Sequence, residues 1–142
     1  MSRSTSMTQS LPIRRSRIGL IALWSLQVVV AALFAFAGGS KLAGAPAMVA
    51  LFDGIGVGQW FRYVTGLIEV ASAIALLVPA LAPFAALLLV PTMLGAIATH
   101  LFIVGGSPAV PILLLLASLA ITWARRGQLS AAVSGLQMNA RA

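Results

Sequence analysis

Four long and nearly uncharged apolar segments, at about 18–38, 63–81, 84–104 and 108–124, constrain the fold of this chain more than any other feature. Each is close to the length of about 20 residues that an α-helix needs to cross the hydrocarbon core of a bilayer. Of the whole chain, 61% is apolar and only 8% charged, whereas a soluble domain usually carries about 25% charged residues. We therefore predict an all-α integral membrane protein, an antiparallel four-helix bundle whose short turns join neighbouring helices.

Basic residues flank the apolar segments. Arg14, Arg15 and Arg17 precede the first segment, and Arg125 and Arg126 follow the last. Basic residues gather on the cytoplasmic side of membrane helices, so four spans with both termini in the cytoplasm satisfy this rule at both ends. We expect a multi-pass protein of the bacterial inner membrane. Nucleic-acid binding is not expected, because the chain has no basic face interleaved with aromatic residues.

The predicted organisation has three parts. These are a disordered basic cytoplasmic tail at 1–17, a four-span membrane domain at 18–127 and a second cytoplasmic tail at 128–142. An alternative for the first segment is a cleaved signal peptide, because Ala35, Phe36 and Ala37 resemble a cleavage site. The apolar run before them is longer than the usual 7–15 residues of such a peptide, which favours a membrane span.

The glycine-rich segment 40–61 connects the first two spans on the outer side of the membrane. Proline is well tolerated in the first turn of a helix, so Pro46 predicts a short helix over 46–52. This helix is apolar, and we expect it to lie in the membrane interface. Trp60 and Tyr63 follow it and are expected at the depth of the lipid headgroups.

Glu69 is the most informative single residue, because a carboxylate inside a membrane span needs compensation. Small and polar residues share its helical face, which indicates that Glu69 points into the bundle. His100 lies in the adjacent antiparallel span, at a similar distance from the outer surface. Each residue also has a plain structural interpretation, Glu69 as a pin between helices and His100 as a satisfied buried side chain.

Two cations lie near the same outer mouth. Lys41 either reaches down to Glu69 or extends its amine to the headgroups, and Arg62 is either an interface anchor or a carboxylate partner. We predict one polar cluster of Lys41, Arg62, Glu69 and His100. Its walls are predicted to be Trp60, Tyr63 and Phe102. The sequence has no cysteine, nucleotide-binding loop or metal triad, so we expect no metal site and assign no catalytic residue.

Several short motifs resemble the DoxX-like family of small four-helix bacterial membrane proteins. They are the stretch Phe36–Gly44 around Lys41, the stretch from Phe61 through Gly66 to Glu69, the pair Gly95 and His100, and the closing Trp123, Arg125 and Arg126. The resemblance covers about 18–127. It implies a four-helix inner-membrane bundle and an association with membrane redox systems, including those that oxidise quinols.

From this resemblance we expect an accessory subunit of a quinone-linked redox system without independent catalytic activity. Quinone is the cofactor considered, near Glu69 and His100, because an acid and a base can exchange quinol protons. A membrane redox protein is the partner that the resemblance implies, besides the lipid bilayer. Two alternatives remain open: a module that binds or transports a small hydrophobic or anionic molecule, and a structural scaffold without a ligand.

Overall fold

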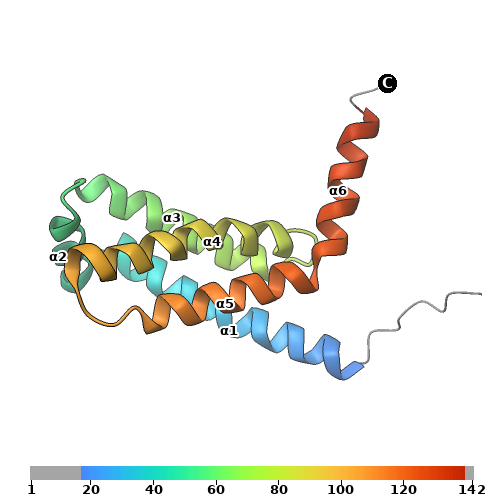
Figure 1. The fold of residues 1–142 in the computed structure, drawn as a ribbon, viewed down its shortest axis with the longest axis horizontal. Coiled ribbons are helices and arrows are strands. Elements are labelled where there is room, and N and C mark those ends of the chain that lie inside the picture. Colours follow the sequence, from blue (N-terminus) through green and yellow to red (C-terminus); the bar gives the residue numbers. More distant parts are fainter. Residues whose placement is uncertain (1–16, 140–142) are drawn as a thin grey trace, which may run out of the picture.

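The computed structural model describes residues 17–139, and this part of the chain is entirely helical (Figure 1). The elements are α1 (Arg17–Leu42), α2 (Pro46–Ile55), α3 (Gln59–Leu76), α4 (Ala82–Thr99), the π-helical turn η1 (His100–Val104), α5 (Ala109–Ala124) and α6 (Arg126–Asn139). The all-α prediction is confirmed for these residues. The predicted disordered tail lies outside them, except for Arg17, which begins α1.

The ends of the helices follow from local chemistry. Helix α2 begins at Pro46, as predicted, and continues past residue 52 to Ile55, where Gly56 adopts a left-handed conformation with φ of 77°. Helix α3 ends at Leu76, earlier than the predicted 81. The amides of Leu77 and Val78 bond to carbonyls only three residues back, because Pro79 cannot continue the helix.

By length and composition, two helices in the described part of the chain are able to cross a membrane by themselves. They are Arg17–Leu42 and the continuous stretch Ala82–Val104. A third span results if α5 and the start of α6 are counted together, although they meet at a bend of 60°. Helix α5 has only 16 residues. Helix α3 is continuous, but the charged residues Arg62 and Glu69 interrupt its apolar sequence. The segment expected as a tail after residue 127 forms α6 as far as Asn139.

The helices α1, α3, α4 and α5 lie side by side, and successive ones run in opposite directions (Figure 1). Helix α1 packs against α3 and α5, and α4 packs against α3 and α5. The core between them contains Val30, Phe34, Leu76, Leu89 and Ile121.

Many large apolar side chains on the same helices face outward, among them Phe36, Leu67, Leu94 and Leu113. An apolar outer surface of this extent suits lipid as the solvent, and it agrees with the prediction of a membrane protein.

Two glycines allow α1 and α3 to approach closely. A Cβ atom added to Gly38 would lie 2.7 Å from the carbonyl oxygen of Gly66 and 2.9 Å from Cβ of Glu69. A Cβ atom added to Gly66 would lie 3.0 Å from Cβ of Lys41. Small residues at such a crossing bring helix backbones together in a membrane, where apolar side chains gain little from leaving lipid.

We expect Gly38→Ala to lower the free energy of unfolding by about 2 kcal/mol, because the added methyl group overlaps backbone atoms that cannot move separately. The measurement is the unfolding midpoint of the purified protein in detergent micelles. Gly39→Ala is the matched control, because a Cβ atom at Gly39 meets nothing within 4 Å. Equal stability of the two variants would contradict the role given to Gly38.

Candidate functional site

An ion pair joins α1 to α3 just beside the glycine crossing. The Nζ atom of Lys41, in the last turn of α1, lies 2.6 Å from Oε2 of Glu69. The Glu69 side chain is only 3% exposed and that of Lys41 only 15% exposed. A charge-assisted hydrogen bond of this length offsets the cost of placing a carboxylate inside the helix assembly. Lys41 therefore reaches Glu69 and does not extend away from it.

Arg62 supports the ion pair from the side. Its Nη1 donates a hydrogen bond to the carbonyl oxygen of Lys41, at the C-terminal end of α1. The positive guanidinium thereby caps the negative end of that helix. Arg62 is buried, and its guanidinium carbon lies 4.3 Å from the centre of the Tyr63 ring. Arg62 thus serves α1 through the backbone of Lys41, and does not itself form an ion pair with Glu69.

Two residues that sequence reasoning did not include extend the site to the surface. Arg62 Nε donates to Oε1 of Gln59 over 2.6 Å. The amide nitrogen of Gln59 donates to Oδ1 of Asp53 at 2.7 Å and to the carbonyl of Val49 at 3.0 Å. These bonds tie α2 to the start of α3. The sequence did contain a sign that Asp53 matters, because it is one of only two acidic residues in the chain.

His100 does not join the ion pair. Its Nδ1 is hydrogen-bonded to the carbonyl oxygen of Ala96 at 2.9 Å, one turn earlier in the same helix. Within residues 17–139, no hydrogen bond connects His100 to Glu69. The two residues were expected to meet because their helices are antiparallel neighbours. However, Glu69 faces α1, so its partner comes from α1 and not from α4.

The predicted aromatic walls also lie elsewhere. Phe102 is 82% exposed, and Trp60 points outward with its indole nitrogen bonded to the carbonyl of Val57. Tyr63 is half-exposed and contacts the site only through its ring on Arg62. The structure therefore brings together Lys41, Arg62 and Glu69, while Trp60, Phe102 and His100 lie apart from the ion pair.

A second polar cluster lies at the opposite end of the helices. Gln27 of α1 is fully buried and donates to the carbonyl oxygen of Leu76 at 2.8 Å. Its Oε1 accepts from Nε of Arg125 at 3.1 Å and from Nη2 at 2.7 Å. Arg125 Nη1 also bonds to the carbonyl of Pro79 at 3.4 Å. Arg125 was predicted as a topology signal, but it also ties α5 to α1 and to the end of α3.

We expect Glu69→Gln to lower the free energy of unfolding by about 3 kcal/mol, because it leaves the Lys41 ammonium without its anionic partner. Thermal unfolding in detergent micelles measures this loss. Asp53→Asn is the matched control, because it neutralises the other acid at the surface. Combining Glu69→Met with Lys41→Met should recover most of the stability, since it removes both charges together. A double variant as unstable as Glu69→Gln would contradict this account.

Comparison with known proteins identifies the family of this chain. The sequence model of the DoxX-like family matches residues 25–124, which run from the middle of α1 to the end of α5. No curated protein and no solved structure gives a significant match. The matched region includes Lys41, Arg62, Glu69 and His100, the four residues of the predicted cluster. Because this match covers more than half of the chain, the protein belongs to the DoxX-like family.

Proposed function

We propose that this chain is a four-span accessory subunit of a quinone-linked redox system in the bacterial inner membrane, without catalytic activity of its own. Membership of the DoxX-like family supports a membrane protein of this type, and the resemblance noted from the motifs supports the redox association. The observation that carries the proposal is the closed Lys41–Glu69 pair. Glu69 and Lys41, the groups best suited to proton chemistry, are used to hold α1 against α3. The proposed role of the chain is therefore to assemble with a partner enzyme.

The bonds that Glu69 and His100 already form argue against a quinone held between them. Glu69 is nearly inaccessible and already bonded to Lys41, and the Nδ1 atom of His100 is bonded within its own helix. The quinone is therefore assigned to the partner enzyme in this proposal. Transport is also less well supported, because the hollow on α1 and the hollow between α3 and α4 are lined by other residues.

Charge distribution supports four spans with both termini in the cytoplasm. The hydropathy of α3 is lowered by Arg62 and Glu69, whose charges are bound inside the structure and so need not face lipid. Arg17, Arg125 and Arg126 lie at one end of the long helices, with the α2 region at the other. The positive-inside tendency then assigns the arginine end to the cytoplasm.

Cysteine labelling tests this topology, because the chain contains no cysteine of its own. Ser107→Cys places a thiol in the turn before α5, and Ser130→Cys places one on α6; both positions are exposed. In intact cells permeabilised only at the outer membrane, an impermeant maleimide should label the first thiol. It should label the second only after lysis. Labelling of both thiols before lysis would place both on the outer side, with no span or an even number of spans between them, and contradict the proposal.

The redox role is tested by deleting the gene and measuring quinol-dependent electron transfer in isolated membranes. We expect deletion to lower the rate at least twofold, and expression of the unmodified chain to restore it. A chain with both Glu69→Met and Lys41→Met should restore the rate as well, because the pair is given a structural role only. An unchanged rate after deletion would contradict the redox association, and failure of the folded double variant would return Glu69 to proton chemistry.

A further inference from the structure

An open hollow of about 630 Å³ lies along the outward face of the first half of α1. Its lining is apolar except for one hydroxyl, and consists of Leu20, Ile21, Trp24, Ser25, Val28 and Val29. All six residues belong to α1, so the hollow is a shallow strip along one helix, open to the surroundings of the bundle. These residues recur every three or four positions, so they form an apolar strip along the axis of α1. A long, flexible hydrocarbon chain fits such a strip.

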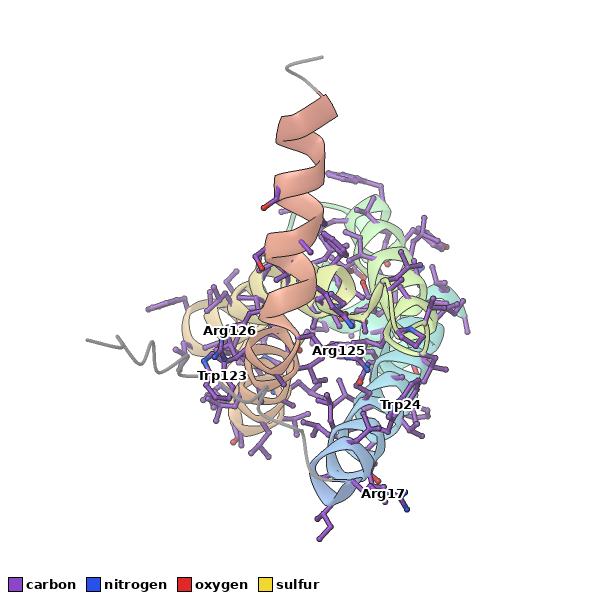
Figure 2. All side chains as sticks on the ribbon, turned by 90° about the vertical axis from the view of Figure 1, so that its right-hand side faces the viewer. Arg17, Trp24, Trp123, Arg125 and Arg126 are labelled. Carbon is purple, nitrogen blue, oxygen red and sulfur yellow. The ribbon has the colours of Figure 1, made fainter. Side chains whose placement is uncertain are left out.

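Arginine side chains lie at the end of this strip. Arg17 precedes Ile21 by four residues and Trp24 by seven, so all three lie on the same face of α1. The guanidinium of Arg125 approaches the same indole from α5, with its carbon 5.7 Å from the Trp24 ring centre. Figure 2 shows Arg17 at the tip of α1 and Arg125 between α5 and α1, whereas Arg126 and Trp123 lie on the side of α5 away from α1.

The acidic side chains of the protein are at the other end. The chain has only two, and Glu69 is paired with Lys41 while Asp53 is bonded to Gln59 beside α2. No side-chain carboxylate of the protein is therefore near Arg17. A lipid phosphate is a negative group able to complement Arg17, because arginine binds phosphate oxygens with two hydrogen bonds.

We propose that the hollow on α1 binds one anionic phospholipid, with an acyl chain along Leu20, Trp24 and Val28 and the headgroup phosphate at Arg17. The apolar strip explains the acyl chain, and the exposed Arg17 explains the negative headgroup. Trp24 lies within the apolar strip, between Leu20 and Val28, and therefore reports on the acyl chain. This inference requires only that the helices lie in a bilayer, and it is independent of the redox association.

Fluorescence quenching in vesicles tests the site directly. The chain has three tryptophans, so Trp60→Phe combined with Trp123→Phe leaves Trp24 as the sole reporter. This protein is reconstituted in vesicles of unlabelled phosphatidylcholine. In one series an increasing fraction of the lipid is phosphatidylglycerol with brominated acyl chains, and in the other it is phosphatidylcholine with brominated acyl chains. We expect phosphatidylglycerol to quench Trp24 at a lower mole fraction. Arg17→Gln should raise the mole fraction for half-quenching by about fivefold, the effect of one basic residue near an anionic surface.

Arg126→Gln is the matched control, because it removes the same charge from the same end of the molecule but away from the hollow. It should leave the preferential quenching of Trp24 by phosphatidylglycerol unchanged. Glycerol phosphate, added as a soluble counterpart of the headgroup, should not relieve the quenching. Three results would overturn the proposal: equal quenching by both lipids, no quenching by either because protein covers the hollow, or equal effects of Arg17→Gln and Arg126→Gln.

Discussion

The ion pair between Lys41 and Glu69 is the interaction on which the arrangement of the helices depends most. Apolar side chains gain little by leaving lipid for another helix, so close packing and polar contacts must hold membrane helices together. The pair forms only because Gly38 and Gly66 let the two backbones approach to a distance that excludes a Cβ atom. Packing and electrostatics thus meet at one crossing of α1 and α3.

A second polar contact secures the same helix. Gln27 binds the end of α3 through the Leu76 carbonyl and binds α5 through Arg125, so α1 is held at a second point, nearer its middle. The two contacts differ in charge. The α2 end contains both acidic residues together with Lys41 and Arg62, while the opposite end carries arginines and no acidic side chain. This asymmetry supports both the proposed orientation in the membrane and the proposed binding of an anionic lipid.

The position of the helices could be read from the sequence because it depends on local properties. Long apolar runs have to be helical in lipid, where every backbone polar group must be bonded within its own segment. Pro46 marked the start of α2, and the turns around Pro79 and Gly105 separated the later helices. The end of α3 was less predictable, since residues 77–81 are as apolar as the helix before them. The helix α6 was not predicted, because its sequence lacks a strong apolar pattern.

By itself, the sequence determined that Glu69 and Gln27 must turn away from lipid, because a polar group in an apolar span has to find a partner. It did not determine which partner. Helical periodicity places a residue on one face of its own helix, but the rotation of that helix against its neighbours is decided by packing. Close contact at Gly38 and Gly66 turns Glu69 towards Lys41, while His100 bonds to Ala96 within its own helix. For the same reason, only the tertiary structure could show that Arg125 bonds to a buried glutamine.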